Sequence, residues 1–283
     1  MKTSLIVITD FYFSEVNGGA EANAEALIDR FKDCDVDITK MKSSQASTQF
    51  LSENKDKVFI FSNFIFLKEE CKQYAINNLR YFVYEQDHKY IRSRNPIKYV
   101  NFVAPKEERV NIDFYKAAIR VLFLTKLSME VFRKNTDLDN LMNLKSSVWR
   151  KHELSYLMKL CNNEKTPKIA IMNSSNPIKR RRDCIEICNK NGWEYDLIED
   201  KDFKNFLRKL SKYEKLLFLT GHLETCARIV VEAKMLNMKV ITNKKLIGAA
   251  SEEWYKLSGK QLINKMEEIS YNMPYRILEV LND

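Results

Sequence analysis

The sequence predicts an α/β protein with two doubly wound, Rossmann-like domains. Short β-branched or aromatic runs alternate with longer helical patterns in both halves of the chain, and this alternation is typical of parallel sheets covered by helices. With 283 residues, the chain is long enough for two medium domains, each with its own core. A polar, asparagine-rich stretch over residues 135–166 ends at Pro167 and separates the two halves.

The predicted strands are short apolar runs. In the first half they cover residues 5–9, 58–62, 81–85 and 121–125, and in the second half residues 168–172, 194–198, 215–220 and 239–242. Parallel strands are buried on both faces, which is why such runs lack polar alternation. We place the domain boundary after residue 155, which gives an N-terminal domain over residues 1–155 and a C-terminal domain over residues 156–283.

Composition narrows the class of protein. No stretch approaches the roughly 18 apolar residues of a membrane-spanning helix, and the first apolar run meets Asp10, so we expect a cytoplasmic protein without a signal peptide. The six cysteines form no close metal-binding pairs. Cys184 and Cys188 lie four apart on a predicted helix, where buried thiols are commoner than metal ligands. The net charge of +9 either attracts polyanions or reflects solvated surface lysines.

The loops that follow predicted strands are the candidate sites, because ligands of open α/β sheets bind beyond the carboxyl ends of strands. After the first strand, Gly18 and Gly19 precede a helical pattern that runs through Phe31. Glycines at this place let backbone amides approach a ligand at a helix N-terminus. An ordinary strand-to-helix turn explains them equally well, since the Rossmann glycine spacing and the Walker lysine are absent.

Asp87 and His88 follow the predicted strand that ends at Glu85. An acid and a histidine at this position are suited to act on an acceptor hydroxyl, with Asp87 as the base and His88 as a hydrogen-bond partner of a sugar. A helix cap beside a surface histidine is the alternative interpretation.

Four consecutive cations, from Lys179 and Arg180 through Arg182, precede a predicted helix in the second half. Positive charge at this end opposes the helix dipole, so a bound anion such as a diphosphate would compensate it. A solvated basic face is the alternative.

The most informative segment contains Glu224 and Glu232, which are separated by seven residues. A helix would place them roughly 12 Å apart, comparable with the span from the sugar of a nucleotide sugar to its ribose. Amides near Thr225 at the start of that helix would meet the diphosphate without a metal. The alternatives are an amphipathic helix with two exposed glutamates, or a strand over residues 229–231.

This Glu-x7-Glu segment resembles the donor-site signature of retaining GT-B glycosyltransferases. The resemblance implies two Rossmann-like domains with the active site in the cleft between them, the acceptor side on the N-terminal domain and the nucleotide sugar on the C-terminal one. It also implies that Glu224 contacts the donor sugar and Glu232 the ribose. The Arg-x4-Lys pair of the family corresponds to Ser174 and Lys179, so the arginine is missing and residues 180–182 are its potential replacement.

A shorter stretch, from Val83 to His88 with Arg92 and Arg94, is similar to phage DNA α-glucosyltransferases that modify hydroxymethylcytosine. This similarity implies that Asp87 is the base and that His88 contacts the donor sugar. It also implies a duplex DNA acceptor and, for a phage protein, a location in the host cytoplasm.

The sequence therefore predicts a metal-independent, cofactor-free retaining glycosyltransferase that moves a hexosyl or pentosyl group from a UDP-linked donor to an acceptor hydroxyl. The predicted catalytic residues are Asp87, His88 and Glu224, and the predicted donor-binding residues are Gly18, Gly19, Lys179, Arg180, Glu224, Thr225 and Glu232. No obvious nucleophile accompanies Asp87, so a covalent intermediate is not expected.

Three alternatives fit the same residues. The acceptor is a surface glycan or a lipid in the first. The second is a GT-A enzyme, whose Asp-x-Asp metal pattern occurs at residues 33–35 and 137–139, although both are expected to be surface turns. The third is a nucleic-acid or carbohydrate binder that kept the fold and lost catalysis, which the missing arginine would permit.

Overall fold

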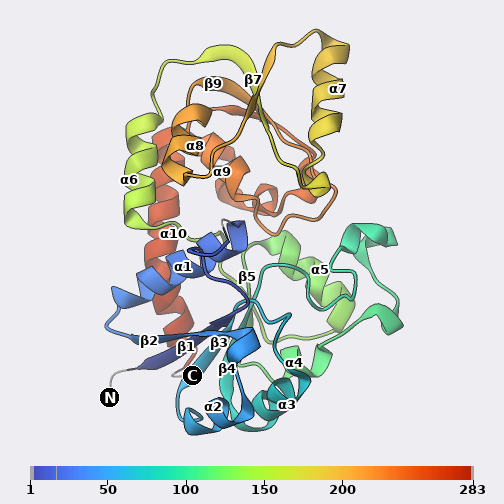
Figure 1. Ribbon diagram of the computed structural model, residues 1–283, viewed down its shortest axis with the longest axis vertical. Coiled ribbons are helices and arrows are strands. Elements are labelled where there is room, and N and C mark those ends of the chain that lie inside the picture. Colours follow the sequence, from blue (N-terminus) through green and yellow to red (C-terminus); the bar gives the residue numbers. More distant parts are fainter. Residues whose placement is uncertain (1–2, 17, 282–283) are drawn as a thin grey trace. The chain divides into compact units, whose positions relative to one another are not determined.

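The computed structural model describes residues 3–16 and 18–281 of the chain. The chain folds into two compact units (Figure 1). The first unit comprises Met1–Arg150 together with Ile269–Asp283, and the second comprises Lys151–Glu268. Each unit is built around a parallel sheet with flanking helices.

The first unit contains a six-stranded sheet of order β2-β1-β3-β4-β5-β6, in which every neighbouring pair is parallel. Its strands are β1 (Ser4–Thr9), β2 (Asp37–Lys42), β3 (Val58–Phe61), β4 (Arg80–Glu85), β5 (Arg120–Phe123) and β6 (Leu141–Asn143). Its helices are α1 (Gly19–Lys32), α2 (Thr48–Glu53), α3 (Glu69–Asn78), α4 (Ile112–Lys116), α5 (Lys126–Thr136) and the end of α10 (Gly259–Glu279).

The second unit contains a four-stranded parallel sheet of order β10-β9-β7-β8. Its strands are β7 (Thr166–Met172), β8 (Tyr195–Ile198), β9 (Tyr213–Leu217) and β10 (Lys239–Ile241). Its helices are α6 (Lys151–Leu160), α7 (Arg181–Asn191), α8 (Phe203–Leu210), α9 (Arg228–Met235) and the start of α10.

The eight strands predicted from apolar runs are present, but the sequence analysis missed β2 and β6. These two are the edge strands of the first sheet. β2 has the sequence Asp-Ile-Thr-Lys-Met-Lys and contains no buried residue, and β6 has only three residues, all half-buried. An edge strand has one strand neighbour and can carry charged side chains, so β2 does not need the apolar run of a central strand.

Aromatic side chains fill one core of the first unit. Phe61, Tyr81 and Phe114 are fully buried and pack with ring centroids 5.0–5.4 Å apart. Removing each such side chain from water contributes about 1.5–3 kcal/mol. The smaller core of the second unit includes Cys184 and Cys188, which are buried on α7 and carry free thiols.

The C-terminal helix α10 belongs to both units, whereas the sequence analysis assigned all of residues 156–283 to the second domain. The Ser270 hydroxyl accepts a hydrogen bond from the backbone amide of Trp149 at 3.1 Å. Arg276 donates to the carbonyl of Asn143 at 2.9 Å. These contacts hold the second part of the helix in the first unit.

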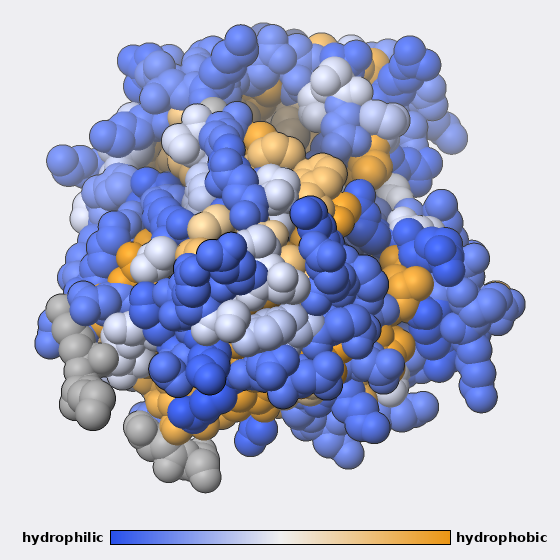
Figure 2. Space-filling view, turned by 60° about the horizontal axis from the view of Figure 1, so that its bottom comes forward, coloured by the Kyte–Doolittle hydropathy of each residue, from blue (hydrophilic) through white to orange (hydrophobic). Residues whose placement is uncertain are grey.

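The described part of the surface agrees with the charged composition. Figure 2 shows a face on which hydrophilic residues predominate and apolar residues form small groups. Among the helices of the described ranges, none has the length and apolarity needed to cross a bilayer.

Candidate functional site

In the second unit, the loops after β7 and β9 bring Lys179 and Glu224 together. The Nζ atom of Lys179 lies 2.8 Å from Oε1 of Glu224, and both side chains are half-buried. The hydroxyl of Thr220 lies 3.1 Å from the same carboxylate oxygen. The amide of Gly221 donates to the carbonyl of Ile178 at 2.7 Å, which ties the two loops together.

Glu224 lies outside the helix in which the sequence analysis placed it. Its backbone forms a parallel bridge with Ile247, because its amide donates to Leu246 at 2.9 Å and its carbonyl accepts from Gly248 at 2.8 Å. Helix α9 begins at Arg228, after Ala227 in a left-handed conformation with φ of 65°. The prediction that one helix carries both glutamates, with its first amides at Thr225, is therefore wrong. The extended backbone at Glu224 and the left-handed Ala227 delay the start of the helix.

Glu232 is buried on α9, with a relative exposure of 3%. Its Oε1 atom lies 3.3 Å from Nε of Arg228, and Nη2 of Arg228 lies 3.5 Å from Oε2 of Glu153 on α6. Buried carboxylates require such partners because desolvation of an unpaired charge is costly. The alternative of two solvent-facing glutamates does not apply, and contact of Glu232 with a ribose stays a prediction.

The run of cations after β7 is partly neutralised within the protein. Arg180 is exposed, has a left-handed φ of 45° and forms an ion pair with Asp183 in the first turn of α7. Arg181 donates to Asn173 at 2.5 Å. Ser174, at the position of the family arginine, accepts a hydrogen bond from the amide of Asn176 at 3.2 Å. Asp183 thus supplies part of the compensation that the helix dipole requires.

In the first unit, α1 begins at Gly19, and Gly18 precedes it with extended backbone. The carboxylate of Glu21 occupies the space that a side chain at Gly18 would need. Burial raises the pKa of Glu21, and the carboxylates of Asp87 and Asp10 raise it further. A carboxylate at this place repels a diphosphate, so the predicted donor contact of Gly18 and Gly19 gains no support from the geometry.

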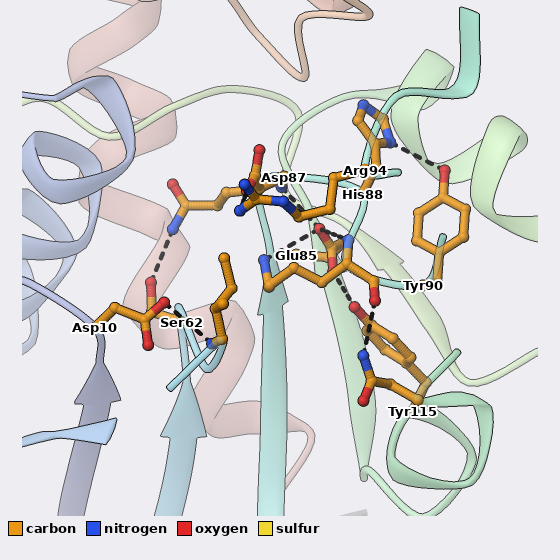
Figure 3. A network of polar contacts seen from close by, with 12 residues as sticks. Asp10, Ser62, Glu85, Asp87, His88, Tyr90, Arg94 and Tyr115 are labelled. Carbon is orange, nitrogen blue, oxygen red and sulfur yellow. Dashed lines mark hydrogen bonds and ion pairs between the residues drawn. The ribbon is translucent and has the colours of Figure 1, made fainter. Parts of the chain in front are cut away.

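Asp87 and His88 follow β4, as predicted (Figure 3). Oδ2 of Asp87 accepts a hydrogen bond from Nη1 of Arg94 at 2.7 Å, and about a third of the Asp87 side chain is exposed. His88 is buried, and its Nδ1 atom lies 3.0 Å from the hydroxyl of Tyr90. The alternative of a surface histidine is therefore wrong, and a sugar contact of His88 stays a prediction.

Glu85, the last residue of β4, is completely buried beside these two residues and was not predicted as a site residue. Figure 3 shows its carboxylate directed toward Tyr115, whose hydroxyl donates to it. The Nζ atom of Lys89 lies 3.2 Å from Oε1 of Glu85. Burial tends to raise the pKa of Glu85, but Lys89, Tyr115 and the amide of Asp87 together lower it. An ionisable residue at the end of a predicted buried strand was the available signal.

Asp10 was also passed over, although it directly follows β1. It is buried and accepts hydrogen bonds from the amides of Ile65 and Phe66, each at 3.1 Å, and from the Ser43 hydroxyl. Asp10 thereby fixes the loop after β3. Because its hydrogen bonds are made within the protein, we assign Asp10 a structural role.

Of the two Asp-x-Asp patterns, residues 33–35 form a turn, whereas residues 137–139 are irregular chain between α5 and β6. Asp33 follows α1, Asp137 ends α5 in a left-handed conformation, and both side chains are exposed. Within residues 3–16 and 18–281, no group of three or more His, Cys, Asp or Glu side chains is arranged to hold a metal ion.

Comparisons with known proteins support the fold. No family model and no curated protein sequence matches the chain. Among solved structures, HepE of Anabaena in complex with UDP and glucose has a TM-score of 0.57 at 10% identity, covering 99% of each chain. A glycosyltransferase from Rickettsia africae has a TM-score of 0.54 at 9% identity, covering 99% of this chain and 97% of the other.

A third similar structure is the UDP-GlcNAc 2-epimerase of Methanocaldococcus jannaschii in complex with UDP-GlcNAc and UDP. Its TM-score is 0.51 at 12% identity, and the match covers 100% of this chain and 99% of the epimerase. Together these structures confirm the two-domain, Rossmann-like GT-B fold that the sequence predicted. The fold hosts both transferases and an epimerase, so function has to be argued from the site.

Proposed function

We propose that the protein is a retaining glycosyltransferase that uses a UDP-linked sugar. The observation that carries this proposal is the Lys179–Glu224 pair at the carboxyl edge of the second sheet. It combines a cation for a diphosphate with a carboxylate for sugar hydroxyls, at the place where α/β sheets bind ligands. The GT-B fold and the UDP or UDP-sugar bound to HepE and to the epimerase support the choice of donor.

In the proposed reaction, the bond between the anomeric carbon and the diphosphate oxygen breaks, and its electron pair leaves with the diphosphate. Lys179 stabilises the charge that develops there, assisted by Arg180 and the cations that follow it. Glu224 holds the hydroxyls of the sugar, and Glu232 those of the ribose. The contact between Lys179 and Glu224 holds both side chains at this loop, and such fixed placement favours catalysis.

The acceptor oxygen forms the new bond to the anomeric carbon, and its proton passes to Asp87. Arg94 keeps the Asp87 carboxylate in one orientation through their 2.7 Å contact. Attack on the face that the leaving group vacates retains the configuration without a covalent intermediate. The products are a glycoside, a nucleoside diphosphate and a proton. Cations of the chain balance the diphosphate, so the mechanism requires no metal and no cofactor.

The acceptor that we propose is a hydroxymethylated base in duplex DNA, which implies a cytoplasmic enzyme. The segment after His88 supports this choice. Residues 91–110 carry five basic and two acidic residues, and a bridge between Ile91 and Arg109 closes the segment into a loop. The buried amide of Asn135 fixes this loop through hydrogen bonds of 2.8 Å to Phe102 and Ala104. A basic loop that follows the proposed catalytic base, Asp87, and is held by hydrogen bonds is suited to contact DNA phosphates.

The deciding experiment incubates labelled UDP sugars with three acceptors, namely hydroxymethylcytosine DNA, unmodified DNA, and a panel of glycans and lipids. We expect label on the first acceptor only. Label on a glycan or lipid would refute the DNA acceptor and keep the transferase, and UDP binding without label on any acceptor would identify a non-catalytic binder.

Asp87→Asn tests the base in the same assay. Transfer should fall at least about 100-fold, since general base catalysis contributes this much, while UDP affinity stays unchanged. Asp139→Asn, at an exposed position before β6, is the matched control.

A further inference from the structure

We propose that Glu85, together with Tyr115 and Lys89, positions the Asp87–His88 turn for transfer. This inference rests on the proposed function. It assigns no contact with substrate to Glu85, which acts through the backbone of the two residues that follow it.

The turn after β4 folds back over the Glu85 side chain. Oε1 of Glu85 accepts from the amide of Asp87 at 2.7 Å and from the amide of Lys89 at 3.3 Å. Nζ of Lys89 lies 3.2 Å from the same oxygen, and the Tyr115 hydroxyl donates to Oε2. Since Tyr115 lies on α4, a separate helix fixes the carboxylate and the carboxylate fixes the turn.

His88 lies at the centre of this turn with a φ of 53°. A left-handed conformation is costly for a residue with a Cβ atom and persists only where its surroundings impose it. Here the amides on both sides of His88 are tied to Glu85, and the His88 carbonyl accepts from Ile91 at 3.0 Å. The network therefore imposes the conformation that directs the Asp87 and His88 side chains.

Stability alone is a poor explanation for this network. Glu85 and Lys89 are 1% and 3% exposed, and a buried ion pair is often no more stabilising than well-packed apolar side chains of similar volume. Lys89 is further secured, because its Nζ lies 5.3 Å from the ring centre of Phe64 and its carbonyl accepts from Asn111 at 2.8 Å. Together these contacts fix the backbone conformation of the Asp87–His88 turn.

Tyr115→Phe is the test variant and Tyr81→Phe is its matched control. Both tyrosines are fully buried in the same core, and each hydroxyl donates one hydrogen bond, from Tyr115 to Glu85 and from Tyr81 to the carbonyl of Phe114 at 2.7 Å. The two substitutions should lower the melting temperature similarly. Only Tyr115→Phe should lower kcat, by about 10- to 100-fold, with the KM for the donor unchanged.

Hydrogen exchange gives a readout that does not depend on activity. The amides of Asp87 and Lys89 should exchange faster in Tyr115→Phe than in the wild type and should stay protected in Tyr81→Phe. Equal kcat values in the two variants, at matched melting temperatures, would overturn the inference while leaving the proposed function intact. A wild type without transfer activity would refute the function, and amide exchange would still decide whether the network holds the turn.

A second pair of variants removes the charges of Glu85 and Lys89. One variant keeps a hydrogen-bond acceptor at position 85, and the other loses it. Glu85→Gln with Lys89→Met retains an oxygen for the two amides, whereas Glu85→Leu with Lys89→Met does not. The first should transfer several times faster than the second, and the second should be as slow as Tyr115→Phe or slower. Comparable kcat values in the two double variants would contradict positioning through the amides.

Discussion

The ammonium of Lys179 and the carboxylate of Glu224 are 2.8 Å apart, although they lie 45 residues apart in the sequence. The contact joins the loops that follow β7 and β9, the two central strands of the second sheet. Each side chain therefore restrains the other within the proposed donor site.

This pair should show coupling in a double-mutant cycle. Lys179→Met and Glu224→Gln each leave a half-buried charge without its partner, which should cost about 1–2 kcal/mol of unfolding free energy. The double variant should cost less than the sum. Denaturant unfolding of the four proteins measures the coupling, and strictly additive losses would show that the contact contributes nothing to stability. UDP calorimetry should show weaker binding for Lys179→Met, whereas Glu224→Ala should mainly disable transfer.

Glu232→Gln should weaken UDP binding by about tenfold, because it loses a charged hydrogen bond to the ribose. Glu153→Gln is the matched control, since both glutamates are buried and pair with Arg228. The two substitutions should destabilise the protein similarly, but Glu153→Gln should leave UDP affinity unchanged. If calorimetry finds the same affinity in both variants, Glu232 is a structural partner of Arg228 and the ribose assignment fails.

Glu21→Gln should stabilise the protein at neutral pH. Because the pKa of Glu21 is raised in the fold, the fold favours the protonated form, and stability is lost as pH rises above the ordinary glutamate value of about 4.3. The neutral amide avoids this loss. We expect a melting temperature about 1–2 °C higher at pH 7 and no difference near pH 4. Glu186→Gln, at an exposed position on α7, is the control and should show neither effect. A gain that is the same at both pH values would contradict the proposed cause.

Transfer should continue in the presence of a chelator, because Lys179 and the cations at residues 180–182 balance the diphosphate. Initial rates before and after treatment with EDTA measure this. A loss of turnover that manganese restores would favour the Asp-x-Asp alternative. Substitution of Asp33 and Asp35, or of Asp137 and Asp139, would then identify the ligands.

Affinity for DNA should fall steeply with salt, by roughly 10³ between 50 and 200 mM if about six phosphates are contacted. Lys98→Glu with Lys106→Glu, in the loop after His88, should reduce the dependence of log Kd on log salt by about one for each phosphate that the variant no longer binds. Lys55→Glu is the control, because this exposed residue precedes β3 and lies at the opposite, amino edge of the sheet.

Mismatched target sites should react faster, since a flipped-out base costs less to expose there. If the variant with Lys98→Glu and Lys106→Glu keeps the salt dependence of the wild type, the proposal that residues 91–110 contact DNA is refuted.

The sequence by itself determined the elements whose signal is local. Strands with a short apolar run were predicted, among them β8 and β10 at the edges of the second sheet. The edge strands β2 and β6 of the first sheet are too polar or too short to stand out. Motif spacing singled out Lys179 and Glu224, and the structure brings these two residues together.

Only the tertiary structure decided the contacts between distant segments. The bridge between Glu224 and Ile247 keeps Glu224 out of α9, and no pattern within residues 224–232 records the segment that pairs with it. Likewise, the sequence around Glu85 does not indicate its hydrogen bond with Tyr115, which lies on α4, 30 residues away. Local propensity depends on neighbours in the sequence, but the ionisation and orientation of a side chain depend on neighbours in space. The folded chain therefore decides which of its predicted residues are free to bind a ligand.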